Sequence, residues 1–103
     1  MAAKWKPKIR FVPEWGPNRM REIEEFIKKE FGYSDGELEN LEVLDYDSLV
    51  AFYTEIIKET IGDYAWEKLG SYIDIDAMIR DDIMSGYITK FKFKGETLYL
   101  REV

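Results

Sequence analysis

The chain of 103 residues is 46% hydrophobic and 16% aromatic, which is sufficient for one packed domain and argues against disorder. Its 21 acidic and 15 basic residues give a net charge of -6, which disfavours direct binding to nucleic acid and favours a basic partner. Cysteine and histidine are absent, which excludes disulfides, thiolate metal sites and histidine-based catalysis. We therefore expect a cytoplasmic protein that is not an enzyme. We also expect it to have no cofactor and no metal.

The N-terminal third is predicted to contain a strand and a helix. Residues 8–12 alternate charged and apolar side chains, as a short strand does, and residues 13–17 then form a turn at two prolines. Apolar residues recur every three or four positions over residues 19–31. This spacing predicts an amphipathic helix, with Asn18 as its N-cap and Gly32 at its end.

The middle of the chain is predicted to be helical. Ser34 and Glu37 have the spacing of a capping box and predict a short helical turn, after which the segment to Leu44 is not assigned. Asp45 or one of the next residues is expected to cap a long helix that ends at Gly62. The apolar face of this helix is expected to comprise Leu49, Phe52, Tyr53, Ile56, Ile57 and Thr60.

Two shorter helices and a β-hairpin are predicted to follow. The first helix is expected to stop at Gly70, and the second, capped by Asp74, is expected to stop at Gly86. Alternating residues on either side of a turn at Lys94 and Gly95 predict the hairpin. One buried face of the hairpin is expected to carry Tyr87, Phe91, Phe93, Tyr99 and Val103.

These elements predict one domain of the α+β class over residues 1–103, with residues 1–7 as a flexible tail. The expected sheet is antiparallel or mixed and three-stranded, made of the N-terminal strand and the C-terminal hairpin. Three to four helices are expected to pack against it.

Acidic residues are concentrated in the middle of the chain. From Glu30 to Asp82 there are 15 acidic residues against Lys58, Lys68 and Arg80, a local net charge of -12. An acidic helical surface that serves only solubility would explain this excess. Alternatively, this charge matches that of roughly 20 Å of duplex DNA, which carries about one charge per 1.7 Å, and a dimer would imitate a longer stretch.

Residues 61–87 carry a second signal. Their order of aromatic, acidic and small residues, an Arg-Asp pair and a glycine resembles the C-terminal region of ArdA-type antirestriction proteins, inhibitors of type I restriction enzymes that imitate bent DNA. The corresponding positions are Tyr72, Asp74, Asp76, Ala77, Arg80, Asp81 and Gly86. The first half of the segment is also similar to the family's antirestriction motif, matching at Glu67, Tyr72 and Asp74, whereas Trp66 stands where the motif has a proline. The family's usual chain is longer and has three small domains.

Charge and resemblance together predict an acidic, DNA-mimicking inhibitor of a DNA-binding host defence enzyme of the restriction or CRISPR type, encoded by a virus or mobile element. The alternative is an acidic interaction or regulatory module whose basic partner is unrelated to DNA. In both cases we expect a basic protein as the partner, no direct contact with nucleic acid, no membrane, and a chain that could form a homodimer.

The predicted partner-binding surface consists of acidic side chains of the central helices. It comprises Asp45, Asp47, Glu55, Glu59, Asp63, Glu67, Asp74, Asp76, Asp81 and Asp82. Trp66 and Tyr72 are predicted to add an aromatic contact, because aromatic residues are enriched at interface hot spots.

A third interpretation is a carboxylate-based metal nuclease. Its magnesium ligands would be Asp74, Asp76, Asp81 and Asp82, with Lys90 or Lys92 as the active-site lysine. Against it, Asp74 is explained as a helix cap and Asp76 as the i, i+4 partner of Arg80, so the sequence does not imply a shared cavity.

Overall fold

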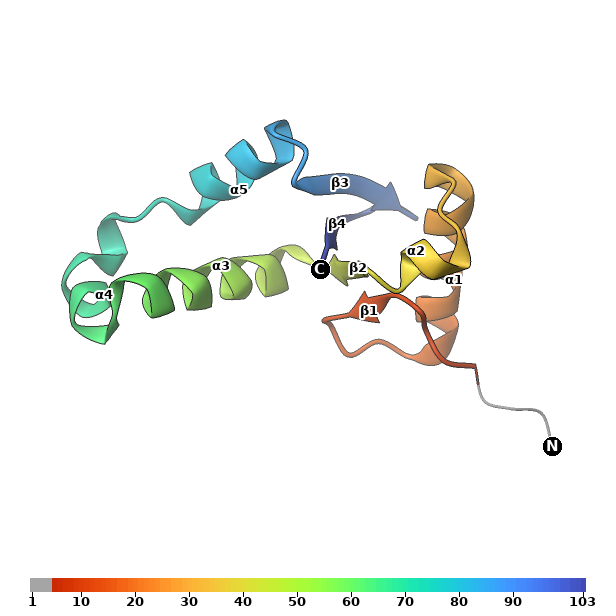
Figure 1. The fold of residues 1–103 in the computed structure, drawn as a ribbon, viewed down its shortest axis with the longest axis horizontal. Helices are drawn as coiled ribbons and strands as arrows, with labels where there is room; N and C mark the ends of the chain where they lie inside the picture. Colours follow the sequence, from red (N-terminus) through yellow and green to blue (C-terminus); the bar gives the residue numbers. More distant parts are fainter. Residues whose placement is uncertain (1–4) are drawn as a thin grey trace.

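The computed structural model describes residues 5–103 and contains five α-helices, a 3-10 helix and a four-stranded mixed sheet within that range (Figure 1). The elements in chain order are β1 (Arg10–Phe11), α1 (Pro17–Phe31), α2 (Asp35–Leu38), β2 (Leu41–Leu44), α3 (Tyr46–Ile61), α4 (Asp63–Leu69), the 3-10 helix η1 (Gly70–Tyr72), α5 (Ile75–Met84), β3 (Ile88–Phe93) and β4 (Glu96–Glu102). The predicted α+β class with a small mixed sheet is confirmed.

Part of the tail predicted over residues 1–7 lies outside the described residues, which begin at position 5. In the described part, Trp5 lies beside α1, and the guanidinium of Arg21 is 5.3 Å from the centroid of the Trp5 ring.

Local side-chain caps explain where most helices begin. The Asp45 carboxylate accepts a hydrogen bond of 2.8 Å from the backbone N–H of Ser48 at the start of α3, as the sequence predicts. Ser34 and Glu37 form both halves of the predicted capping box of α2. The start of α1 differs from the prediction: the helix begins at Pro17, before Asn18, because proline fits the first helical position and needs no donor there.

The sheet has one strand more than the sequence predicted. Its order is β1-β2-β4-β3, so β2 is an interior strand, which pairs in parallel with β1 and antiparallel with β4. The first strand therefore joins the hairpin through β2 and not directly. All four residues of β2 are buried, including the charged Glu42, whereas a charged residue in a short strand normally indicates an exposed face.

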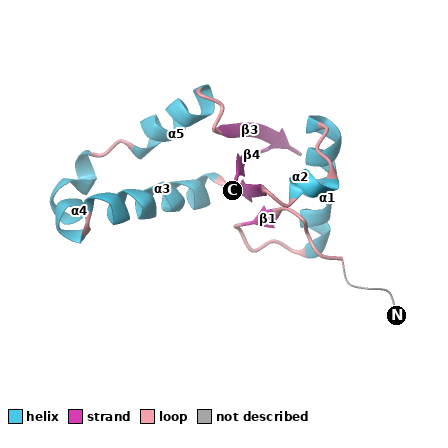
Figure 2. Cartoon of the chain, in the orientation of Figure 1, coloured by secondary structure: helices cyan, strands magenta, loops and turns pink. Residues whose placement is uncertain are grey.

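Helices cover both faces of the sheet, with α1 and α2 on one side and α3 and α5 on the other (Figure 2). On the first face the core comprises Ile9, Ile23, Ile27, Leu38, Leu41, Val43, Phe91, Phe93, Leu98 and Leu100. On the second face it comprises Leu44, Leu49, Tyr53, Ile79, Ile88 and Tyr99. The molecule is thus a three-layer arrangement in which a short sheet separates two apolar cores.

The hairpin does not have the single buried face that was predicted, because helices cover both faces of the sheet. Phe91 and Phe93 face α1, whereas Tyr99 faces α3 and α5, because its neighbour Leu98 already points to the first core. Tyr87 and Val103 flank the strands and are 74% and 63% exposed, so their predicted burial is wrong. The predicted turn is confirmed: Lys94 and Gly95 have φ of 48° and 81°, as a type I′ turn requires.

Helices α3, α4, η1 and α5 form an arm that extends beyond the sheet (Figure 1). The molecule measures 54 × 31 × 25 Å, and its radius of gyration is 15.8 Å, against about 13 Å for a compact chain of this length. Leu49, Tyr53 and Ile57 of α3 are buried at four-residue spacing, but Ile61 at its end is 39% exposed. Packing against the sheet therefore decreases along α3.

No helix within residues 5–103 combines the length and apolar composition that a membrane span requires.

A buried carboxylate connects β1, β2 and β4 on the α3 side of the sheet. The Glu42 side chain is 5% exposed and accepts a hydrogen bond of 2.7 Å from Arg101 Nε, while Arg10 Nε lies 3.4 Å away. The Arg101 guanidinium also lies 4.2 Å from the centroid of the Phe52 ring on α3. Because a buried carboxylate is costly without a partner, this contact ties the sheet order to the position of α3.

We predict that Glu42→Ala destabilises the fold by about 3 kcal/mol, because it leaves Arg101 without its buried partner. Urea unfolding at neutral pH measures the change. Glu39→Ala is the matched control, since Glu39 is exposed and its variant is expected to change stability by less than about 0.5 kcal/mol. Equal urea midpoints for the two variants would refute this role of Glu42.

Candidate functional site

The arm carries more than the whole net charge of the protein. We define the acidic arm as residues 45–85, which span α3, α4, η1 and α5, and the sheet end as the rest of the chain. The acidic arm has 10 acidic and 3 basic residues, a net charge of -7, whereas the sheet end has 11 acidic and 12 basic residues. The charge asymmetry noted in the sequence thus becomes a spatial separation.

Ion pairing follows the same division. All six ion pairs found among residues 5–103 lie in the sheet end: Lys8–Asp35, Lys28–Asp35, Arg10–Glu42, Arg101–Glu42, Arg19–Glu96 and Lys94–Glu22. The four pairs that do not involve Glu42 are exposed, so each of these four contributes little to stability. Their main consequence is that charges of the sheet end neutralise one another.

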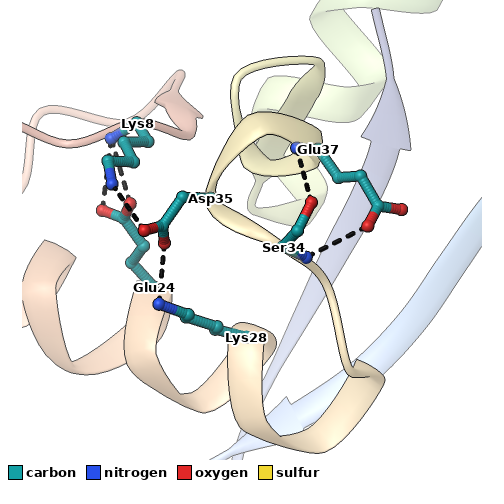
Figure 3. Close-up of polar contacts among 6 residues, drawn as sticks. All are labelled: Lys8, Glu24, Lys28, Ser34, Asp35 and Glu37. Atoms are coloured by element: carbon teal, nitrogen blue, oxygen red, sulfur yellow. Dashed lines mark hydrogen bonds and ion pairs between the residues drawn. The ribbon is translucent and has the colours of Figure 1, made fainter.

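The contacts of Asp35 illustrate this neutralisation (Figure 3). Asp35 lies 2.7 Å from Lys28 Nζ and 3.2 Å from Lys8 Nζ, and the hydrogen bonds from Lys28 and Lys8 lower the pKa of its carboxyl. The nearby Glu24 is buried and accepts hydrogen bonds of 3.1 and 3.3 Å from the backbone N–H of Lys8. Burial raises the pKa of Glu24.

Seven of the ten predicted surface carboxylates are exposed and have no ion pair or side-chain hydrogen bond within residues 5–103. They are Asp47, Glu55, Glu59, Asp63, Glu67, Asp76 and Asp81. The other three have local roles: Asp45 and Asp74 cap α3 and α5, and Asp82 accepts a hydrogen bond from the Tyr53 hydroxyl. The predicted surface therefore divides into free carboxylates and structural ones.

The spacing of the free carboxylates is regular but sparse. Glu55 and Glu59 are four residues apart on α3, as are Asp63 and Glu67 on α4, so each pair rises about 6 Å along its helix. The 16 residues of α3 span about 24 Å and include three acidic side chains, whereas duplex DNA of that length carries about 14 charges. One arm thus has only a fraction of the charge density of DNA.

The structure does not bring together the four carboxylates of the proposed metal site. Asp74 and Asp76 line a pocket of about 410 Å³ that Lys90 also lines, whereas Asp82 lines a different pocket. No cluster of three or more acidic side chains suited to a metal ion occurs in residues 5–103. The predicted pair of Asp76 with Arg80 is not formed, although both residues line the same pocket.

The two predicted aromatic contacts differ in exposure. Tyr72 is 83% exposed, whereas the Trp66 ring is half-buried and packs on Gly70, where an added Cβ would lie 3.0 Å from it. Tyr64 and Leu69, which were not predicted as contact residues, are 76% and 55% exposed. No side chain of α4 is buried, so these apolar groups lie open at the end of the arm.

An apolar groove lies between the two helices of the arm. We define the α3–α5 groove by Tyr53, Ile56 and Ile57 of α3, Met78 and Asp82 of α5, and Tyr87. Its volume is about 320 Å³. This groove was not predicted from the sequence, because helical periodicity cannot show how far apart two helices pack.

Comparisons of the chain with protein-family models, with curated proteins and with solved structures found no match. The ArdA-type resemblance of residues 61–87 therefore stays a sequence-based hypothesis. These residues run from the end of α3 through α4, η1 and α5 to the start of β3, so they coincide with the far part of the arm.

We predict that Tyr53 contributes to loss of stability in alkali. Burial and the Asp82 carboxylate raise the pKa of the Tyr53 phenol, whereas an unfolded tyrosine ionises near about 10. The unfolded state therefore releases this proton first, and stability falls as pH rises above about 10. Urea unfolding at pH 8 and 11 is expected to show a smaller alkaline loss for Tyr53→Phe than for the unmodified protein, with about 1 kcal/mol lower stability at pH 8.

Tyr72→Phe is the control for this experiment, because Tyr72 is exposed and its hydroxyl makes no hydrogen bond within residues 5–103. It is expected to lose as much stability in alkali as the unmodified protein. Burial also raises the pKa of Tyr99, so part of the alkaline loss persists in Tyr53→Phe. An identical alkaline loss in Tyr53→Phe and Tyr72→Phe would refute the prediction.

Proposed function

We propose that the protein is a non-catalytic inhibitor whose acidic arm binds the basic, DNA-binding surface of a partner protein. The observation that carries the proposal is the separation of charge: the sheet end pairs its charges internally, and the acidic arm presents seven exposed carboxylates without an ion pair in residues 5–103.

Free carboxylates suit this role for two physical reasons. A charge that is already paired gains little from a second partner, whereas an exposed and unpaired carboxylate can meet a lysine or arginine across an interface. The summed field of the arm also accelerates encounter with a basic surface, and the effect weakens as salt is added. Acidic and basic surfaces would thus find each other as DNA finds its binding proteins.

The resemblance of residues 61–87 to ArdA-type proteins supports a host defence enzyme of the restriction or CRISPR type as the partner. The low charge density of a single arm favours partial imitation of DNA by one copy. Two arms side by side in a homodimer would come closer to the charge of duplex DNA. We include this dimer in the proposal.

A second function has a specific observation in its favour. Tyr64, Leu69 and Tyr72 are more than half exposed on the same arm as the carboxylates. Electrostatic imitation of phosphates does not require apolar side chains, whereas protein interfaces are enriched in aromatic residues. This combination supports an acidic interaction or regulatory module with a basic partner unrelated to DNA.

We predict that replacing Glu55, Glu59, Asp63 and Glu67 by amides weakens the electrostatic part of binding without unfolding the protein. These residues are exposed, and none provides a side-chain cap. The measurement is displacement of fluorescent duplex DNA from a type I restriction enzyme and from a CRISPR effector at several salt concentrations. The unmodified protein is expected to displace DNA with steep salt dependence, and the variant to be weaker by at least about tenfold.

The matched control removes the same amount of charge from the sheet end, by replacing Glu14, Glu30, Glu39 and Glu102 with Gln. All four side chains are exposed. This control is expected to displace DNA nearly as well as the unmodified protein. Failure of the unmodified protein to displace DNA from either enzyme would overturn DNA mimicry and favour the second function, and equal loss in both variants would show that only total charge matters.

A further inference from the structure

The α3–α5 groove combines an apolar floor with an open rim. Tyr53 and Ile57 are each 8% exposed at its floor, next to Ile88 of β3, which is 4% exposed. At its rim Ile56 is 44% exposed and Tyr87 74% exposed. Three elements thus hold apolar groups around a space that the chain itself does not fill.

The rim has a further apolar member on the opposite helix. Met78 of α5 is 38% exposed and faces the groove across from Ile56 of α3. Methionine is unbranched and adapts its shape to a bound side chain, which suits a surface that binds partners. An incoming apolar residue would contact both helices at once.

The groove contains one carboxylate without an ion pair. Arg101 borders the groove, but its guanidinium is already paired with Glu42. Asp82 accepts a hydrogen bond from the neutral Tyr53 hydroxyl and has no ion pair within residues 5–103. A cationic group that enters beside Met78 would therefore find a half-buried carboxylate without a countercharge.

The groove belongs to the acidic arm, whose net charge is -7. Glu59 on α3 and Asp81 on α5 are exposed without an ion pair in the described chain. An apolar groove on an acidic arm, with the unpaired Asp82 in its lining, is complementary to an amphipathic segment with an apolar stripe and flanking lysines or arginines. Charge complementarity thus selects one class of occupant.

We propose that the α3–α5 groove binds a basic amphipathic helix of the partner protein, with an apolar side chain between Ile56 and Met78 and a lysine or arginine beside Asp82. The inference rests on the proposed function, because it specifies which part of the partner the acidic arm contacts. It adds a short-range apolar anchor to a long-range electrostatic attraction. The anchor is expected to slow dissociation, whereas the surrounding charges mainly accelerate association.

The probe is a synthetic leucine–lysine peptide with leucines at positions i, i+3, i+4 and i+7 of a helix. A peptide of the same composition in scrambled order is the peptide control. Calorimetric titration of the full chain is expected to detect the patterned peptide and to show binding that is weaker by about tenfold or more for the scrambled one. Equal affinity for both peptides would overturn the groove as the site, since charge alone would then explain binding.

The protein variants separate the groove from the rest of the surface. Ile56→Ser combined with Tyr87→Ser removes two exposed apolar side chains of the rim and is expected to lower the affinity for the patterned peptide by about tenfold. Met84→Ser combined with Val103→Ser removes two exposed apolar side chains outside the groove, and its affinity for the patterned peptide is expected to stay within about twofold of that of the unmodified protein. Retained affinity in the groove variant would refute the proposal.

Asp82→Asn tests the cationic contact separately, because asparagine can still accept the hydrogen bond of Tyr53. Asp82→Asn is expected to weaken binding of the leucine–lysine peptide but not binding of a leucine–glutamine peptide of the same pattern.

Sedimentation equilibrium tests whether a second copy of the chain occupies the groove. A dimer that is lost in the variant Ile56→Ser with Tyr87→Ser would assign the groove to a second copy and overturn the proposal. DNA displacement by the acidic arm would be unaffected by either failure, since Glu55, Glu59, Asp63 and Glu67 do not line the groove.

Discussion

The short interior strand β2 is the constraint from which the shape of the molecule follows. The four residues of β2 span about 13 Å, whereas the 16 residues of α3 span about 24 Å. Along this strand α3 buries Leu49 and Tyr53 in the core, and Ile57 is its last buried residue. The remainder of α3 leaves the sheet and carries α4 with it. The arm thus begins where α3 extends past the short strand β2. The two apolar cores on the faces of the sheet keep the fold stable despite this extension.

The arm and the sheet end differ in how their charges are paired. At the sheet end, basic residues face acidic ones across neighbouring elements, and even the buried Glu42 is matched by Arg101 and Arg10. On the arm, few basic residues are available, and repulsion is tolerated because exposed carboxylates are well hydrated and screened by salt. Binding to a basic surface would relieve that repulsion. The residues proposed to bind the partner therefore lie on the acidic arm, which contributes least to the core.

The groove adds specificity that charge alone lacks. Electrostatic attraction recognises any basic surface, whereas an apolar groove of about 320 Å³ with a half-buried carboxylate accepts a limited set of side chains. Tyr53 links the two properties, because its ring lies in the core and its hydroxyl holds Asp82 at the groove. Stability of the α3 face and recognition at the groove would therefore change together at this residue.

Local sequence determined much of the secondary structure: Asp45, Asp74 and the Ser34–Glu37 pair start helices, and the Lys94–Gly95 turn makes the hairpin, because these are short-range hydrogen bonds and backbone preferences. Composition likewise determined the concentration of acidic charge. Only the tertiary structure decided that β2 is an interior strand, that both sheet faces are buried and that seven carboxylates of the arm have no ion pair in the described residues. Strand order, helix packing and charge pairing depend on contacts between residues far apart in the chain, which neither helical periodicity nor capping patterns contain.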